Sequence, residues 1–241
     1  MRADGVANTD AIAAWEILRG RARGYARDAW PPGPGGDARC VSCQGPSHPG
    51  SARCFQCAEH VETAPGMLAD VVAPVAYARK GGRLARDLWL YKSGRPGALE
   101  AGASLLGLLL VFLADQGPRL WQRAGMAAPT HACVVPSGRG RPAPHPLKAL
   151  ATDYLALPWL SLQPWDQADP GVRALDPGRF RAPGPLSGAR VLLLDDTWTS
   201  GASAQSAAVA LKRAGAQSVV AVVLGRHLSS SRPPARQVNR L

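Results

Sequence analysis

Apolar and polar positions along the chain alternate in a way that predicts strands and helices in turn. Short apolar runs bounded by turn residues suit strands buried on both faces of a parallel sheet. Such runs occur at residues 71–77, 132–136, 159–164, 191–194 and 218–224. Helices are predicted at residues 9–29, 83–92, 97–114, 118–123, 147–154 and 204–214. Strands that alternate with helices indicate an α/β fold with a parallel sheet.

The two ends of the chain differ in pattern from its middle. Residues 9–29 have apolar positions at helical spacing and a basic second half, and a Pro- and Gly-rich linker follows at residues 31–38. The last residues are rich in Ser, Pro and Arg and are predicted to be disordered. The predicted parts are a basic helix and linker (1–38), a small cysteine segment (39–62), the α/β domain (63–225) and a disordered basic tail (226–241).

The longest apolar run covers residues 103–114. A spanning helix needs roughly 20 apolar residues, so this run predicts a buried helix, with contact to a membrane as the alternative. The N-terminus carries Asp4, Asp10 and Glu16 and has no apolar segment typical of a signal peptide. We therefore expect a cytoplasmic protein without a membrane partner.

The formal net charge is +11, which favours an anionic partner. Most of the basic residues are Arg. The abundance of Ala, Gly, Arg and Pro also suits a GC-rich genome, so composition permits nucleic-acid binding without requiring it.

Four of the five cysteines form two Cys-x-x-Cys pairs separated by ten residues. Two such pairs can surround one tetrahedral Zn²⁺, because each turn presents two thiolates and a flexible loop joins them. A redox dithiol is the alternative, although one pair would suffice for it. The fifth, Cys133, is expected to be a buried core thiol. The predicted structural zinc ligands are Cys40, Cys43, Cys54 and Cys57.

Residues 191–203 contain the most informative pattern in the chain. Four aliphatic residues precede Asp195 and Asp196, and a loop of small and hydroxyl-bearing residues leads into an Ala-rich helix. In an α/β protein the loop amides and the helix N-terminus can bind a phosphate, while the carboxylates accept hydrogen bonds from ribose hydroxyls. A buried strand with an acidic turn and a capped helix is the simpler alternative.

This stretch resembles the phosphoribosyl-diphosphate (PRPP) motif of type I phosphoribosyltransferases and, more narrowly, of the ComF-like family. It departs from the usual pattern at Trp198, which replaces an aliphatic residue. The four-cysteine segment ahead of the α/β domain is similar to a module of ComF-like proteins, and residues 77–92 loosely resemble a Tyr and Lys segment of that family. The resemblance implies catalytic roles for Asp195 and Asp196. It implies a 5′-phosphate loop of Thr197, Thr199, Ser200, Gly201, Ala202 and Ser203.

Two further segments gain candidate roles from the resemblance. A glycine-rich turn after the strand at 132–136 corresponds in position to the pyrophosphate loop, and a turn-rich segment at 165–188 corresponds to a mobile loop that closes over the substrate. An exposed turn and an ordinary solvent loop are the respective alternatives. The pyrophosphate-side candidates are Ser137, Gly138, Arg139 and Arg141, and the mobile-loop candidates are Arg179 and Arg181.

The resemblance implies a protein that binds PRPP with Mg²⁺ and transfers the phosphoribosyl group to an unknown nitrogenous acceptor, releasing pyrophosphate. A non-catalytic role remains open: binding of PRPP or a nucleotide, or an accessory function in DNA uptake (competence) with contact to single-stranded DNA. The sequence names neither the acceptor nor a general base.

Overall fold

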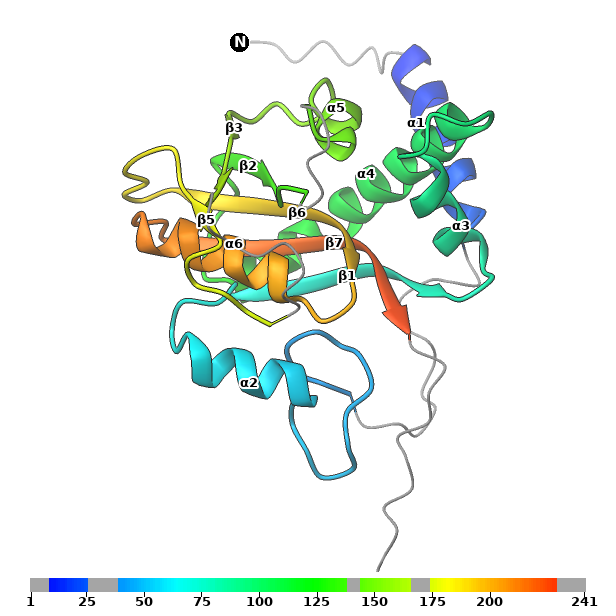
Figure 1. The fold of residues 1–241 in the computed structure, drawn as a ribbon. Coiled ribbons are helices and arrows are strands. Elements are labelled where there is room, and N and C mark those ends of the chain that lie inside the picture. Colours follow the sequence, from blue (N-terminus) through cyan, green and yellow to red (C-terminus); the bar gives the residue numbers. More distant parts are fainter. Residues whose placement is uncertain (1–8, 26–38, 138–143, 166–173, 229–241) are drawn as a thin grey trace, which may run out of the picture.

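The structure is a computed structural model, and it describes residues 9–25, 39–137, 144–165 and 174–228. A five-stranded sheet of order β1-β7-β6-β2-β3 forms its centre, and every pairing in it is parallel. The predicted α/β architecture is confirmed (Figure 1). The strands are β1 (Val71–Arg79), β2 (His131–Val134), β3 (Trp159–Leu160), β4 (Gln163–Pro164), β5 (Phe180–Arg181), β6 (Arg190–Trp198) and β7 (Ser218–Leu228).

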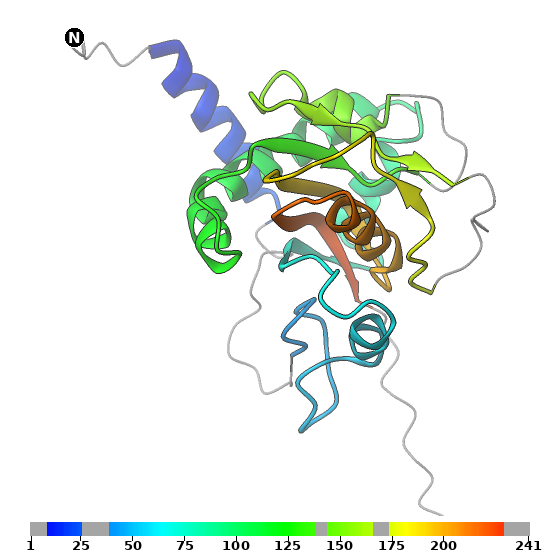
Figure 2. The same cartoon turned by 90° about the vertical axis from the view of Figure 1, so that its left-hand side faces the viewer.

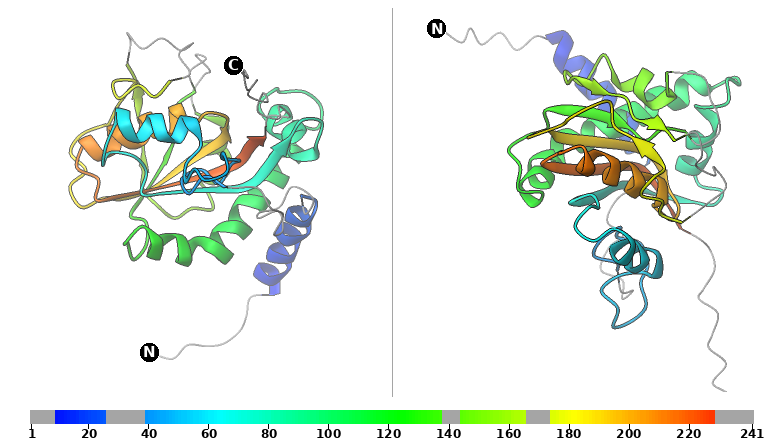
Figure 3. Two further views of the ribbon diagram at one scale, coloured as in Figure 1. Left: turned by 90° about the horizontal axis from the view of Figure 1, so that it is seen from below. Right: turned by 60° about the vertical axis from the view of Figure 1, so that its left-hand side comes forward.

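Helices cover both faces of the sheet. From below, α6 and α2 lie on one side, and α4 and α1 lie on the other (Figure 3). Because both faces are covered, the central strands are apolar on both sides, and residues 191–194 and 219–224 are buried throughout. The helices are α1 (Thr9–Arg23), α2 (Phe55–Thr63), α3 (Arg83–Leu90), α4 (Ala98–Arg123), α5 (Pro146–Ala151) and α6 (Ala202–Arg213).

The helix α4 differs from its prediction, because one continuous helix replaces the two expected at 97–114 and 118–123. Pro118 lies inside it, and burial of Leu120 in the same core as Leu105 holds the second part in line. Among the described residues, α4 alone is long and apolar enough to cross a membrane by length and composition. It packs against α1, α3, β1 and β7. These contacts are those of a core helix.

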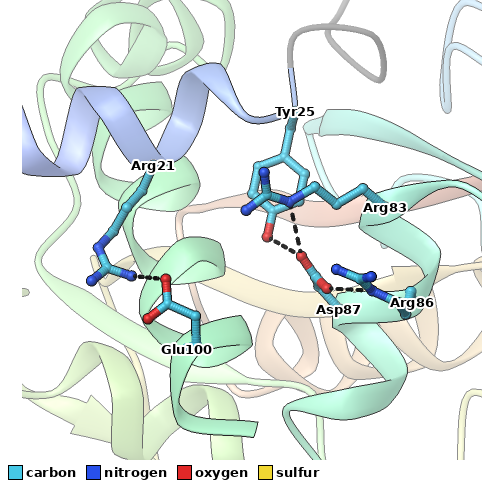
Figure 4. Close-up of polar contacts among 6 residues, drawn as sticks. All are labelled: Arg21, Tyr25, Arg83, Arg86, Asp87 and Glu100. Carbon is cyan, nitrogen blue, oxygen red and sulfur yellow. Dashed lines mark hydrogen bonds and ion pairs between the residues drawn. The ribbon is translucent and has the colours of Figure 1, made fainter. Parts of the chain in front are cut away.

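Polar contacts attach α1 and the residues after it to α3 and α4 (Figure 4). The Tyr25 hydroxyl donates to the buried carboxylate of Asp87 at 2.9 Å, and Arg83 and Arg86 pair with the same carboxylate. At Gly107 a Cβ would lie 3.0 Å from a backbone carbonyl of α1, so the two helices approach closely. The predicted N-terminal helix is therefore docked on the α/β domain as far as Tyr25.

Two strands extend beyond their predicted ends. The strand β6 continues through Trp198, which places the two adjacent aspartates inside the strand. The strand β7 continues through Leu228, because its last residues pair with β1, Tyr77 with Arg226 and Arg79 with Leu228. The first three residues of the predicted tail thus belong to the sheet, and residues 229–241 lie outside the described part.

The predicted strand at 159–164 divides between two sheets, since β3 joins the central sheet and β4 pairs with β5. The segment carrying the cysteines lies below β1, one of the two edge strands of the central sheet (Figure 2). Because the five strands of the central sheet are parallel, their carboxyl ends all lie along one edge, where ligands of open α/β sheets bind.

Candidate functional site

The candidate site begins at the carboxyl end of β6. Successive residues of a strand point to opposite faces, so Asp195 and Asp196 occupy different environments despite being adjacent. Asp196 faces α3: its Oδ2 accepts a hydrogen bond of 2.6 Å from the Tyr91 hydroxyl and forms an ion pair with the Lys92 ammonium. Tyr91 and Lys92 directly follow α3, more than a hundred residues earlier in the chain.

The two carboxyl groups titrate differently because of these surroundings. Burial and the neighbouring Asp196 raise the pKa of Asp195 to about 8. Burial also acts to raise the pKa of Asp196, but the charge of Lys92 and hydrogen bonds from Lys92 and Tyr91 outweigh it and lower that pKa. The surroundings therefore favour a proton on Asp195 and a negative charge on Asp196, next to the Lys92 ammonium.

Two histidines lie close enough to this carboxylate to interact with its charge. His145 favours the ionised form of Asp196, and Asp196 in turn favours the protonated form of His227. Burial, with Arg226 and Lys92, outweighs that effect and lowers the pKa of His227. His145 also accepts a hydrogen bond from Leu147 N at the start of α5.

The predicted phosphate loop connects β6 to α6. Gly201 is the N-cap of α6 and has φ +85°, a conformation that glycine adopts readily. A Cβ at this position would overlap the indole of Trp198, so the tight turn over that ring needs glycine. Ser200 Oγ accepts from Ala202 N at 3.3 Å. The first helical amides lack intrahelical acceptors and α6 has no acidic residue in its first turn, which suits an anion.

The predicted mobile-loop residues have separate positions. The Arg179 side chain is buried, and its guanidinium donates to Ser203 Oγ at 3.1 Å in the first turn of α6. Arg181 instead stacks over the Trp165 ring. Arg179 thus places a positive charge beside the predicted phosphate loop, whereas the contact that the structure gives Arg181 is with the Trp165 ring.

The predicted pyrophosphate turn is only partly described. Ser137 follows β2, partly buried, at the same edge of the sheet as Asp195. The other three candidates, Gly138, Arg139 and Arg141, lie outside the described residues.

The second candidate site is the cysteine cluster. The Sγ atoms of Cys40, Cys43, Cys54 and Cys57 all lie within 4.8 Å of one another. The Sγ atoms of Cys43 and Cys54 are 3.8 Å apart. That is too long for a disulfide, whereas a tetrahedral site with Zn–S bonds of about 2.3 Å separates its sulfurs by about 3.8 Å. The cluster therefore has the size and donor set of a metal site.

Local backbone geometry forms this cluster. The Cys40 amide donates to the Gly45 carbonyl and the Gln44 amide donates to the Cys40 carbonyl, which closes the first turn. Cys43 N points at Cys40 Sγ at 3.5 Å. Cys54 precedes α2 and Cys57 lies in its first turn. Hydrogen bonds among the four thiols lower the pKa of Cys40 and raise the pKa values of Cys43 and Cys57, so the sulfurs share protons closely without a metal ion. A metal ion would replace those protons, because the thiolate is the form that binds metal.

The expected role of Cys133 agrees with its surroundings, since it is fully buried in the core and burial raises its pKa to about 12. Tyr91, Lys92 and Arg226 were not predicted from the sequence as site residues. Tyr91 and Lys92 end the helix predicted at residues 83–92, but their contact with Asp196 depends on tertiary structure. Arg226 fell in the predicted tail.

Comparisons with known proteins give a limited result. No family model and no curated protein matches the chain. One solved structure that it resembles is adenine phosphoribosyltransferase from Leishmania donovani, with 15% sequence identity and a TM-score of 0.30. The alignment covers 52% of this chain and 68% of that one. The function of the chain is therefore inferred from its own residues.

Proposed function

We propose that the chain binds PRPP with Mg²⁺ at the carboxyl end of β6 and transfers its phosphoribosyl group to a nitrogenous acceptor. One observation carries this proposal. Two aspartates, a loop of hydroxyl-bearing residues and the N-terminus of α6 follow one another at the ligand-binding edge of a parallel sheet. The resemblance of residues 191–203 to the PRPP motif of type I phosphoribosyltransferases supports it.

In the proposed complex the loop from Thr197 to Ser203 and the first amides of α6 bind the 5′-phosphate, with the charge of Arg179 nearby. Asp195 and Asp196 accept hydrogen bonds from the ribose hydroxyls. Both side chains offer the oxygen ligands that Mg²⁺ takes, and the charge of the ion would favour the ionised form of Asp195 as well as that of Asp196. The ion would also supply positive charge for the diphosphate. Lys92 keeps Asp196 ionised in the absence of ligand.

The reaction is a displacement at C1′. The acceptor nitrogen forms a bond to C1′ while the bond from C1′ to the diphosphate oxygen breaks, and pyrophosphate leaves with the bonding electrons. A proton carried by the acceptor nitrogen is released to solvent. Positive charge develops on the ribose, and fixed carboxylates next to it stabilise that charge without reorganising. Arg139 and Arg141 remain the proposed contacts of the departing pyrophosphate.

A thermal-shift measurement with PRPP and Mg²⁺ tests the binding step. Ligand at about 100 times its Kd stabilises a protein by about 2.7 kcal/mol, or roughly 5–10 °C for a chain of this size. The shift is expected in the wild type and in the matched control Asp115→Asn, which alters an exposed carboxylate on α4. It should be lost in Asp195→Asn. Equal shifts in the two variants would refute the site. Pyrophosphate release with a panel of bases then tests turnover.

The net charge of +11 favours a second candidate function, contact with single-stranded DNA in an accessory role. DNA binding with a steep salt dependence that is unchanged in Asp195→Asn would support this function. Binding of PRPP without pyrophosphate release from any base would support a non-catalytic role.

The proposal for the cysteine cluster is one structural Zn²⁺ held by all four thiolates. Its four sulfur donors leave no position for substrate, which is typical of structural sites.

A further inference from the structure

Arg226 of β7 is a buried cation between the two candidate sites. Its side chain is only 7% exposed, and its Nη1 donates to the carbonyls of Thr199 at 3.1 Å and Trp198 at 3.4 Å. Nη1 also lies 3.2 Å from the His227 carbonyl, while Nε is buried and has no hydrogen-bond partner among the residues that the structure describes. Burying a guanidinium with an unsatisfied N–H is costly, so the surrounding structure must hold it in place.

The other side of this guanidinium packs against the turn that carries the first two cysteines of the cluster. A Cβ at Gly45 would overlap the Nη2, Nε and Cζ atoms of Arg226, so the guanidinium packs directly against the Gly45 backbone. The Gly45 carbonyl accepts the amide of Cys40, a proposed metal ligand. The position of the Gly45 backbone therefore depends on the turn that carries Cys40 and Cys43.

A second contact holds the same turn against the sheet. The Tyr77 hydroxyl of β1 donates to the Gln44 carbonyl at 2.9 Å, and Arg39 donates to the Tyr77 oxygen at 2.7 Å. Cys40 and Cys43 also share one buried apolar cluster with Trp198. The turn at Gln44 and Gly45 is thus attached to both β1 and β7, next to the end of β6.

We propose that Arg226 couples the four-cysteine cluster to the loop after β6, so that a metal ion in the cluster holds residues 198–201 in the observed conformation. A bound ion fixes the Cys40–Cys43 turn and hence Gly45. Gly45 confines the guanidinium against the carbonyls of Trp198 and Thr199, and the Trp198 ring in turn packs against Gly201 at the start of α6. Without the ion the turn loosens, the guanidinium gains room and the loop opens more often. This coupling does not depend on what the loop binds.

Hydrogen–deuterium exchange of the full chain, measured without substrate, tests the coupling. Loss of about one hydrogen bond's stabilisation corresponds to roughly fivefold faster local exchange. We expect that acceleration at residues 199–205 when a chelator removes the metal, and also in metal-loaded Gly45→Ala. The matched control is Gly184→Ala, whose added Cβ meets no atom within 4 Å. Exchange at residues 192–194 in the central strand should stay slow in every sample.

The variant Arg226→Met tests the route of the coupling. It should retain one metal per chain, show fast exchange at residues 199–205 with metal bound, and respond little to the chelator. An undiminished chelator effect in Arg226→Met would overturn the proposal. So would metal-independent exchange in the wild type, absence of bound metal, or equal exchange in Gly45→Ala and Gly184→Ala. If Arg226→Met does not fold, the Gly45→Ala comparison decides. Failure of PRPP binding would leave these exchange results unchanged, which separates this proposal from the proposed function.

Discussion

The cysteine cluster and the aspartate pair both concentrate like ionisable groups, but they are built from different parts of the chain. All four cysteines come from residues 40–57, and local turns bring their sulfurs together. Asp195 and Asp196 are adjacent in sequence, yet the ionisation of Asp196 is set by Tyr91 and Lys92, which lie more than a hundred residues earlier in the chain. A set of metal ligands can be local, whereas the ionisation of a buried carboxylate depends on distant neighbours.

The two regions also balance their charge differently. Four thiolates need a cation from outside the chain, and the spacing of the sulfurs suits one. The Lys92 ammonium pairs with the Asp196 carboxylate, and the raised pKa of Asp195 disfavours a second negative charge beside it. The cysteine cluster should therefore respond most strongly to metal, and the aspartate pair to pH and to the loss of Lys92.

The largest effect is expected from removing the metal ion. An ion present at about 1,000 times its Kd stabilises the native state by about 4 kcal/mol, so a chelator or Cys40→Ser should lower the free energy of unfolding by that order. Elemental analysis of the wild type should find one zinc per chain, and Cys40→Ser should lose it.

Cys133→Ala is the matched control, because Cys133 is also buried but stands outside the cluster. It should keep its zinc. A zinc content that is unchanged in Cys40→Ser would show that the cluster is not the metal site.

The next largest effect is expected from Asp196→Asn, which leaves the Lys92 ammonium without its carboxylate. Breaking one side of a buried ion pair costs about 3 kcal/mol, because the remaining charge is uncompensated. Denaturant unfolding measures the loss. The double variant Asp196→Asn with Lys92→Met should recover part of it, and an additive double variant would mean that the two groups do not interact.

The smallest effect is expected from Asp195→Asn, which should raise the free energy of unfolding, whereas the two changes above lower it. The pKa of Asp195 is raised from 3.8 to about 8, so the folded state binds its proton more tightly than the unfolded state does. The stability from this proton is complete below pH 4 and is lost as pH rises to about 8. Because Asp195 is partly exposed, we expect Asp195→Asn to gain only about 1 kcal/mol over the wild type at pH 8.5 and nothing at pH 4. Thermal unfolding across this pH range measures the difference, and a constant difference at all pH values would contradict it.

The sequence by itself determined the parts of this protein that depend on short-range pattern. The apolar runs at 191–194 and 218–224 predicted buried parallel strands, and both are in the central sheet. The spacing of the cysteine pairs predicted a cluster, and the sulfurs lie together. These predictions succeed because periodicity, turn chemistry and ligand spacing act over a few residues.

The tertiary structure alone decided how the elements interact. Pro118 did not end α4, because packing of Leu120 in the core continues the helix. Arg226 belongs to β7 because β1 extends far enough to pair with it. Only the fold brings Lys92 to Asp196 and Arg226 to Gly45. Contacts between residues far apart in sequence leave no local pattern, so the charge state of the aspartates and the link between the two regions follow from packing.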